Sequence, residues 1–318
     1  AEIYDPQSKM WKPGGNMIYP GTAHTATLLP SGLVLIAGGY HIQYTANGSD
    51  YAFPANAQLY QPQSNQWALG PAMVNSRFAH SATLLPNGKV LIAGGVSGIS
   101  NSYLNSTEIY DPTLNTFKAS APMLQAKASH AALLLPNGKV LVTGGETPGG
   151  EPYAGAELYD PASNSWKAAA PMNKVRKDHR MVLLPNGKVL TAGQLPVNGM
   201  PPSTIEPGDA EVYDPALNQW TPTALMASQA LMPSLTVMGN QKVLLTALDP
   251  IQKENTAQVY DPISDQWSEA KPLTWERKNR EAQKLPDGKV LILCGTPSGD
   301  PNPIPIAEIY DPGIFYGK

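Results

Sequence analysis

Short apolar runs recur along the chain in pairs, and each pair is joined by a polar turn. In the segment HSATLLPNGKVLIAGG, at residues 80–95, the runs SATLL and KVLIA flank a Pro-Asn-Gly turn. Asn-Gly tolerates the positive φ angles of tight hairpin turns, so this pattern predicts two antiparallel strands. The glycine pair that follows, Gly94 and Gly95, is expected where neighbouring repeats crowd the backbone and leave no room for a side chain.

Two more strands are predicted after each hairpin. The third, as at residues 108–110, stops at Asp-Pro because proline cannot donate to a strand ladder and favours a turn. The fourth carries an aromatic ring seven residues beyond the Tyr of the third. Large rings of this kind usually lie in the interior, so we expect these to pack between neighbouring repeats. The pairs are Tyr60 and Trp67, Tyr110 and Phe117, Tyr159 and Trp166, Tyr213 and Trp220, and Tyr260 and Trp267.

The hairpin occurs six times, and its spacing decides the predicted fold class. The residue after the turn falls at Leu33, Lys89, Lys139, Lys188, Lys242 and Lys289, at intervals of 56, 50, 49, 54 and 47 residues. A period of ~50 residues with four strands per unit predicts an all-β, six-bladed β-propeller with four antiparallel strands in each blade. The innermost strands begin near His24, His80, His130, His179, Pro233 and Arg280.

The segment AEIYDP occurs twice, at residues 1–6 and 307–312. One copy must lie outside the regular pattern, and we expect the segment through Trp11 to close the last blade beside the C-terminal strand. Residues 1–318 are therefore predicted to form a single propeller domain, with a ring closed by N-terminal and C-terminal strands. A seven-bladed ring with one incomplete blade stays open as an alternative.

The repeat resembles the kelch motif. The resemblance is carried by the Gly pairs, by the Tyr and Trp seven positions apart, and by an Arg-x-x-His before the first strand, as at Arg77 and His80. It covers essentially the whole chain and implies a β-propeller, in agreement with the periodicity. The segment LLPNGKVLIAGG is similar, more narrowly, to bacterial kelch proteins and to the propeller of galactose-oxidase-like copper oxidases.

The comparison with galactose oxidase can be made residue by residue. In that family, copper is held partly by a Tyr-His pair at the start of an innermost strand, and a second Tyr is crosslinked to a Cys. Here the His is matched, whereas the residues before it are Ala23, Ala79, Ser129 and Asp178. Cys294 stands at the first position of a Gly pair, which is a different place from the crosslinked Cys. A radical-copper site is therefore not expected, and a simpler metal site stays open.

Composition narrows the classes of partner. Charged residues make up 15% of the chain and the formal net charge is −3, with no basic stripe, so nucleic acid is not an expected partner. No apolar run approaches the ~18 residues of a membrane-spanning helix. The single cysteine excludes an internal disulfide. Loops rich in Pro, Gly, Asn and Ser favour a secreted or cell-surface protein, either a monomer or part of a larger multidomain chain.

Histidines occupy equivalent places in the first four repeats, just before the innermost strand. In a propeller they would form a ring of imidazoles at one level of the channel, where they could bind copper, iron or zinc. The alternative is structural, with each His hydrogen-bonded to a neighbouring blade. These candidate metal ligands are His24, His80, His130 and His179.

A second set of side chains lies three residues before these positions: Gly21, Arg77, Lys127, Arg176, Ala230 and Arg277. With Arg280, the three arginines of this set would make a cationic ring that suits a carboxylate or another anion, since guanidinium groups bind such ligands bidentately. The alternative is that the arginines pair with acids in adjoining loops. The candidate acids are Glu146, Glu151, Glu206, Asp209, Asp249 and Asp300.

The longest loop at the predicted channel mouth runs from residue 40 to residue 56. It carries His41, Tyr44, Tyr51 and Phe53. Tyrosines in loops on a rigid scaffold provide a large contact area at low entropic cost, so Tyr44 and Tyr51 are candidate ligand contacts. The alternative is that these tyrosines pack on their own loop.

Three functions stay open on the sequence alone, because propellers host unrelated activities. The first, which we favour, is an extracytoplasmic binding module that recognises a protein or carbohydrate ligand at the channel mouth. The second is a metal-dependent oxidoreductase that uses the His ring, like galactose oxidase without its Tyr-Cys radical. The third is a cofactor-free sugar mutarotase or epimerase, an activity that the kelch resemblance implies.

Overall fold

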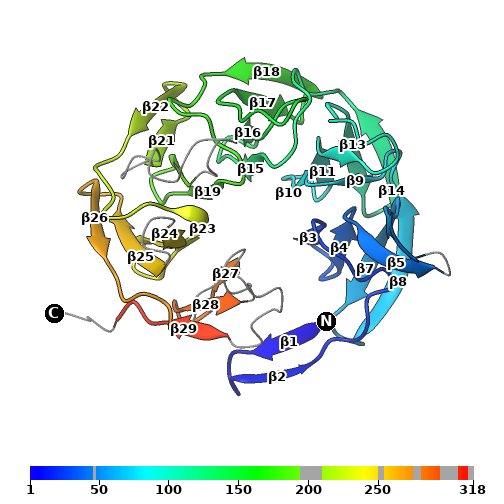
Figure 1. The fold of residues 1–318 in the computed structure, drawn as a ribbon, viewed down its shortest axis with the longest axis horizontal. Helices are drawn as coiled ribbons and strands as arrows, with labels where there is room; N and C mark the ends of the chain where they lie inside the picture. The colour runs from blue at the N-terminus through cyan, green and yellow to red at the C-terminus, as the bar shows by residue number, and fades with distance from the viewer. Residues whose placement is uncertain (46–47, 194–209, 250–253, 275–280, 294–306, 314–318) are drawn as a thin grey trace. The chain divides into compact units, whose positions relative to one another are not determined.

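The computed structural model describes residues 1–45, 48–193, 210–249, 254–274, 281–293 and 307–313. The regular elements among these residues are β-strands, paired in antiparallel sheets (Figure 1). The chain divides into two compact units, Ala1–Ala169 and Ala170–Lys318. Each unit contains three successive repeats, and each repeat folds as one sheet, which we call a blade.

The first unit holds three four-stranded blades. Blade 1 has the order β3 (Thr25–Leu28), β4 (Val34–Ala37), β7 (Asn56–Gln61) and β8 (Gln66–Ala72). Blade 2 has the order β10 (Ser81–Leu84), β11 (Val90–Ala93), β13 (Thr107–Asp111) and β14 (Thr116–Ser120). Blade 3 has the order β15 (Ala131–Leu134), β16 (Val140–Thr143), β17 (Ala156–Asp160) and β18 (Ser165–Ala169). The first strands lie next to one another, with β10 in contact with both β3 and β15 (Figure 1).

Three short hairpins add to these blades. They are β1 (Glu2–Asp5) with β2 (Met10–Pro13), β5 (His41–Thr45) with β6 (Gly48–Ala52), and β9 (Arg77–Phe78) with β12 (Val96–Ser97). The last two lie in or beside the loops that follow the second strands of blades 1 and 2. The first comes before blade 1.

The second unit repeats the arrangement. Blade 4 has the order β19 (Arg180–Leu183), β20 (Val189–Ala192), β21 (Ala210–Asp214) and β22 (Gln219–Pro222). Blade 5 has the order β23 (Leu231–Val237), β24 (Val243–Asp249), β25 (Glu254–Asp261) and β26 (Gln266–Glu269). Blade 6 has the order β27 (Glu281–Lys284), β28 (Val290–Leu293) and β29 (Glu308–Tyr310). The first strand β23 contacts both β19 and β27.

The second strand of each blade supplies much of the core. Every residue of β11, β16 and β20 is buried, as expected for a strand covered on both faces. The predicted packing of the aromatic pairs between blades is confirmed. Tyr110 of blade 2, for example, lies in one cluster with Leu29 and Met73 of blade 1.

The aromatic pairs also have a fixed local geometry. Tyr110 lies directly opposite Phe117 in the register of β13 and β14, with ring centroids 5.0 Å apart. The Tyr110 hydroxyl donates to Oδ1 of Asn115, which holds a left-handed turn conformation at φ 50°. Asn adopts this conformation more readily than most residues, so the turn and the buried ring support each other. The same Tyr-to-turn hydrogen bond occurs at Tyr60, Tyr159, Tyr213 and Tyr260.

The Gly pairs lie where the sequence predicts crowding between blades. A Cβ on Gly38 would come within 2.5 Å of Cε1 of His80, in the next blade. A Cβ on Gly39 would come within 2.9 Å of Cβ of His24, in the same blade. No side chain fits at such distances, and both glycines have positive φ. The first glycine of the pair therefore allows close contact with the next blade, and the second allows close contact with the residue before the first strand of its own blade.

These observations confirm the predicted fold class, an all-β, six-bladed β-propeller. Five blades have four described strands and the sixth has three. No helix that could span a membrane occurs among the described residues. The closure of the domain by its terminal strands stays a prediction.

Candidate ligand-binding face

Two kinds of loop meet at one end of every blade. In blade 2, Ser81 at the start of the first strand lies opposite Ala93 at the end of the second. The loop that enters the first strand and the loop that leaves the second therefore lie at the same edge of the sheet, which we call the loop end. The Asn-Gly turns lie at the opposite edge, the turn end. The candidate site residues Arg77, Arg176, His80, His130 and Tyr51 belong to the loop end.

Arg77 and Arg176 lie inside the blades. The Arg77 guanidinium donates to Oε1 of Glu108 at 2.7 Å and to the carbonyl oxygens of Gly94 and Ser106 at 2.8 and 2.9 Å. Arg77 is 0% exposed, so it presents no surface to a ligand. Burial lowers the pKa of Arg77, and the adjacent Glu108 carboxylate opposes that shift. Arg176, also 0% exposed, donates in the same way to Glu211 at 3.0 Å.

The acid of each pair also fixes the backbone of the entering loop. Glu108 accepts from the backbone N–H groups of Val74 and Asn75 at 2.7 and 3.1 Å. The Glu108 carboxylate therefore accepts three hydrogen bonds, two from backbone N–H groups and one from a guanidinium, which together stabilise its buried charge. In blade 3 the cation is Lys127, whose Nζ lies 2.8 Å from Glu157 and 5.5 Å from the centroid of the Tyr153 ring. These ion pairs are internal supports of the loop end.

The two blades without the cation also lack the acid. Blade 1 has Gly21 at the cation position and Gln58 in place of the acid. Gln58 Oε1 still accepts from the backbone N–H groups of Ile18 and Tyr19 at 2.7 and 3.1 Å. Blade 5 has Ala230 and Gln258, and Gln258 accepts from Ala227 N–H at 2.8 Å. In both blades the glutamine still accepts from the backbone of the entering loop. The carboxylate is absent together with the cation, because a buried carboxylate without a cation would be costly.

The histidines bridge neighbouring blades where their bonds are described. Nε2 of His80 lies 3.0 Å from the Thr25 hydroxyl, and Nε2 of His130 lies 2.9 Å from the Ser81 hydroxyl. Burial lowers the pKa of both imidazoles to about 3, so both are neutral at pH 7. This is the structural role that the sequence left open as the alternative. His24 is partly buried and His179 is 1% exposed.

The described contacts of His80 and His130 give them structural partners instead of a shared metal ion. In His80 and His130, Nε2 is engaged by a hydroxyl of the preceding blade, and Cε1 lies against a glycine of that blade. Among the residues that the structure describes, no three His, Cys, Asp or Glu side chains are grouped so that they could hold a metal ion. The geometry of the donors therefore gives no support to copper, iron or zinc at the His set, and that site stays a prediction.

The long loop of blade 1 folds as a hairpin with one aromatic face. His41 pairs with Ala52 and Ile42 pairs with Tyr51 in the β5–β6 register. Next to them, Tyr40 and Phe53 pack on Phe78 of blade 2, with ring centroids 5.5 Å apart in each case. Tyr40 also meets the edge of Tyr51 at 5.5 Å. The inner part of this hairpin is thus anchored to blade 2.

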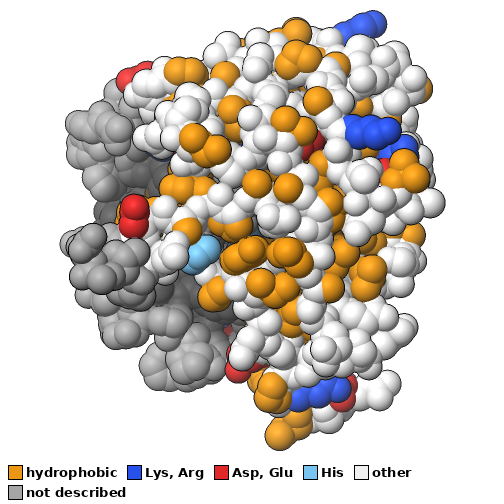
Figure 2. Space-filling view, turned by 90° about the vertical axis from the view of Figure 1, so that its right-hand side faces the viewer, with side chains coloured by type: hydrophobic (Ala, Val, Ile, Leu, Met, Phe, Trp, Pro, Cys, Tyr) orange, Lys and Arg blue, Asp and Glu red, His pale blue; other side chains and the backbone are white. Residues whose placement is uncertain are grey.

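The outer part of the same face is left open to solvent. Ile42 is 50% exposed and its cross-strand neighbour Tyr51 is 59% exposed. Ile99, in the corresponding loop of blade 2, is 89% exposed and follows Gly98, which Phe53 covers so closely that a Cβ there would clash at 2.2 Å. The side of the molecule drawn in Figure 2 carries many hydrophobic side chains among uncharged polar ones and few charged side chains. We call Ile42, Tyr51 and Ile99 the loop-end apolar patch.

Of the predicted ligand contacts, Tyr51 alone has a described, exposed side chain. Tyr44 is in strand β5, but its side chain lies outside the described residues, as do Arg277 and Arg280. The sequence interpretation missed Ile42 and Ile99. A signal for Ile42 was available, because Asn47-Gly48 between two alternating segments is typical of a hairpin.

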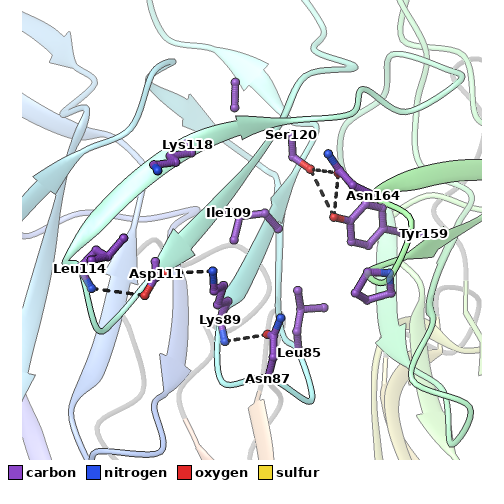
Figure 3. Close-up of a pocket in the computed structure, with 12 residues that line it drawn as sticks. Leu85, Asn87, Lys89, Ile109, Asp111, Leu114, Lys118, Ser120, Tyr159 and Asn164 are labelled. Carbon is purple, nitrogen blue, oxygen red and sulfur yellow. Dashed lines mark hydrogen bonds and ion pairs between the residues drawn. The ribbon is translucent and has the colours of Figure 1, made fainter.

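The turn end carries a groove between blades 2 and 3, with a volume of about 300 Å³ (Figure 3). Its polar side chains bond one another. Lys89 pairs with Asp111 at 2.8 Å, and Asn164 Oδ1 accepts from the hydroxyls of Tyr159 and Ser120 (Figure 3). Similar grooves occur between blades 1 and 2 and between blades 4 and 5. The groove is therefore a recurring feature of blade packing.

Comparison with known proteins supports the same interpretation. The kelch motif matches residues 77–124 and 127–173, which are blades 2 and 3 with their entering loops. Residues 77–173 therefore carry two kelch motifs within the β-propeller. The solved structure of YjhT superposes with a TM-score of 0.64 at 15% identity, covering 83% of this chain and 88% of that chain. At this identity the likeness concerns the fold alone. No curated protein matches the chain by sequence.

Proposed function

We propose that this kelch propeller is a binding module that recognises a protein ligand through the loop-end apolar patch. The observation that carries the proposal is the exposed cross-strand pair Ile42 and Tyr51 on a hairpin whose base is fixed to blade 2. Exposed apolar side chains held on an anchored loop are typical of protein-interaction sites. Kelch propellers commonly bind proteins, which agrees with this assignment.

A protein ligand is favoured over a carbohydrate by the kind of side chains exposed. Tyrosine suits either ligand, because its ring can stack on a sugar or pack in a protein interface. Ile42 and Ile99 provide aliphatic surface without hydrogen-bonding groups. Such surface gains most from apolar side chains of a partner.

The buried state of Arg77 and Arg176 removes two of the side chains that would have favoured an anionic ligand. Each has its charge matched inside the blade, by Glu108 and Glu211. We therefore base the proposal on apolar contacts.

The proposal is tested by selecting binding peptides from a phage-displayed library against the parent protein. Selected peptides are then measured against Ile42→Ser/Tyr51→Ser, with Leu114→Ser as the matched control. Leu114 is 59% exposed but lies in the turn after β13, at the other end of blade 2. We expect at least tenfold weaker binding to the double variant and unchanged binding to the control.

Equal binding of the selected peptides to parent and double variant would overturn the proposal. A glycan array measured in parallel tests the carbohydrate alternative. Glycan binding that is lost with Tyr51→Ser and kept with Ile42→Ser would assign the patch to a sugar that stacks on Tyr51.

A further inference from the structure

Blade 1 departs from the other blades at the turn end. In blades 2 to 6 a lysine follows the hairpin turn and pairs with the Asp after the third-strand Tyr, as Lys89 does with Asp111 at 2.8 Å. Blade 1 has Leu33 and Gln61 at these two positions. An ion pair that recurs in five blades is thus replaced by two uncharged side chains. The other four pairs are Lys139 and Asp160, Lys188 and Asp214, Lys242 and Asp261, and Lys289 and Asp311.

This replacement changes the groove between blades 1 and 2. Lys89 and Asp111 line the next groove, between blades 2 and 3 (Figure 3). Leu33 takes the place of that lysine in the groove between blades 1 and 2, which we call the neutral groove. None of the described residues that line it is charged. Charged side chains line the grooves between blades 2 and 3, 4 and 5, and 5 and 6.

The neutral groove is also larger and has an apolar floor. Its volume is about 530 Å³, against about 300, 310 and 410 Å³ for the other three grooves. Leu33 and Leu59 are half-buried and pack on the cluster that contains Tyr110. Pro30 lies beside Gly88 of blade 2, where an added Cβ would be 3.4 Å from the proline Cγ. Sites for small molecules typically have volumes of roughly 300–1,000 Å³ and mostly apolar linings.

The rim of the neutral groove carries uncharged polar groups. Ser31 and Asn87 lie in the two hairpin turns, and Thr113 and Asn115 lie in the turn after β13. All four residues are exposed. Their hydroxyl and amide groups can hydrogen-bond a polar group of a ligand without requiring that the ligand be charged. The lining therefore matches a ligand with an apolar body and no net charge.

The charge difference also decides which groove gains from an apolar ligand. A ligand that covers Leu33 removes apolar surface from water, which is favourable. A ligand that covers the Lys89–Asp111 pair removes water from two charges, which costs free energy. The apolar surface therefore ends after one blade. A stable protein interface needs about 800 Å² on each partner, so a small molecule fits this surface better than a protein does.

We propose that the neutral groove binds a small, uncharged molecule with an apolar ring or chain. The floor of Leu33 and Leu59 provides the apolar contacts, and the polar rim orients the ligand. The site lies at the turn end, at the opposite edge of the sheet from the loop-end apolar patch. Binding at the two sites can therefore be tested separately.

The test uses N-phenyl-1-naphthylamine, a neutral fluorescent probe whose emission rises in apolar surroundings. It is titrated into the full chain and then displaced by a matched pair of competitors, neutral 2-naphthamide and anionic 2-naphthoate. We expect saturable binding of one probe per chain, and at least tenfold weaker displacement by the naphthoate because no cation lines the groove. Absence of saturable probe binding, or equal displacement by the two competitors, would overturn the proposal.

A double variant separates the neutral groove from other surfaces. Leu33→Lys/Gln61→Asp gives blade 1 the ion pair of the other blades without changing the net charge. We expect at least tenfold weaker probe binding. Leu217→Lys is the matched control, since Leu217 is 70% exposed in a turn of blade 4, and it should leave binding unchanged. Thermal unfolding followed by circular dichroism confirms that each variant is folded.

A second variant leaves the floor of the groove intact. Thr113→Trp, at the exposed rim, obstructs the groove and should also weaken probe binding at least tenfold. Probe binding that survives both this change and the double variant would overturn the proposal. Binding that is lost with Ile42→Ser/Tyr51→Ser would overturn it too, because the probe would then occupy the loop-end apolar patch.

Discussion

The Arg77 guanidinium lies 2.7 Å from the Glu108 carboxylate, and the two side chains are 0% and 1% exposed. An ion pair out of contact with water is costly to break, because the remaining charge loses its partner without regaining solvent. The same blade position carries an uncharged pair in blades 1 and 5. This relationship leads to the first prediction.

Arg77→Ala should destabilise the protein by about 3–5 kcal/mol, because it leaves Glu108 buried and unpaired. Adding Glu108→Gln should recover much of this loss, since Ala with Gln is the natural pair of Ala230 and Gln258 in blade 5. Urea unfolding of both single variants and the double variant measures the effect. Additive losses in the double variant would contradict the interpretation of this pair as one coupled support.

The second prediction concerns how the free energy of unfolding depends on pH. The pKa of His80 and of His130 is lowered to about 3 in the folded protein, mainly by burial, from about 6.5 in the unfolded chain. Between these values the unfolded state binds more protons, so stability falls as pH falls from about 6.5 towards 3. Each histidine contributes a slope of up to about 1.4 kcal/mol per pH unit.

His130→Gln tests this dependence, because Gln keeps a hydrogen-bonding group near Ser81 but does not titrate. The variant should have a shallower loss of stability between pH 6.5 and 4.5 than the parent, measured by urea unfolding at several pH values. An unchanged slope would show that the His130 imidazole is accessible to protons in the folded state.

The third prediction uses the backbone just before the histidines. Ala79 has φ 52°, in the left-handed region, and its N–H donates to the Ala23 carbonyl of blade 1 at 3.3 Å. Glycine adopts this conformation without the steric cost that alanine has. Ala79→Gly should therefore raise the free energy of unfolding by up to about 1 kcal/mol. A decrease would indicate that the Ala79 methyl group contributes packing that outweighs the conformational strain.

The fourth prediction concerns a change from glycine to alanine where neighbouring atoms leave no room for a Cβ. Gly95 has φ 94°, and a Cβ there would lie 2.5 Å from the carbonyl oxygen of Phe78. Gly95→Ala should cost several kcal/mol, beyond the roughly 1 kcal/mol that a positive φ alone implies. Gly149→Ala is the matched control, since Gly149 also has positive φ but nothing lies within 4 Å of its Cβ position. Thermal unfolding of the two variants should differ clearly, and equal losses would refute the steric explanation.

The fifth prediction concerns the Tyr-to-turn hydrogen bond. Tyr110→Phe removes the bond to Asn115 while keeping the ring in its apolar cluster. We expect a loss of about 1 kcal/mol, as is usual for one buried hydrogen bond. Lys89→Met breaks an ion pair whose lysine is 42% exposed and should cost less. Urea unfolding should therefore show a larger loss of stability for Tyr110→Phe than for Lys89→Met. The reverse order would contradict a stabilising role of the hydrogen bond between Tyr110 and Asn115.

Much of the fold was predictable because each repeat contains local sequence signals for its own strands and turns. The Asn-Gly turn, the Gly pair and the Tyr with its aromatic partner are local signals, and they repeat often enough to reveal their spacing. The charge pairing was also present in the sequence but went unrecognised. Arg77 pairs with Glu108 on the third strand, which was not among the candidate acids, and comparing both positions across blades would have shown Gly21 with Gln58.

The candidate site was less predictable because exposure depends on what packs above a loop. Tyr51 and Phe53 stand two residues apart in the sequence, yet Phe53 covers Gly98 of the next blade and Tyr51 stays 59% exposed. The length and register of the β5–β6 hairpin decide which ring reaches blade 2. The motif has no residue that specifies this hairpin, since it occurs in one loop and not in the repeat.

The contact between the first glycine of a pair and the histidine of the next blade has an evolutionary consequence. Gly38 receives His80 of blade 2, and Gly94 receives His130 of blade 3. Because one repeat carries both the glycine and the histidine, a tandem duplication of its coding segment supplies a new blade that already matches its neighbours on both sides. Blade 5 departs from this pattern, since Pro233 faces Gly193 of blade 4 where the first four repeats have a histidine. The contact between Pro233 and Gly193 thus matches blades 4 and 5 to each other, while blades 1 to 3 keep the common contact between a glycine and the histidine of the next blade.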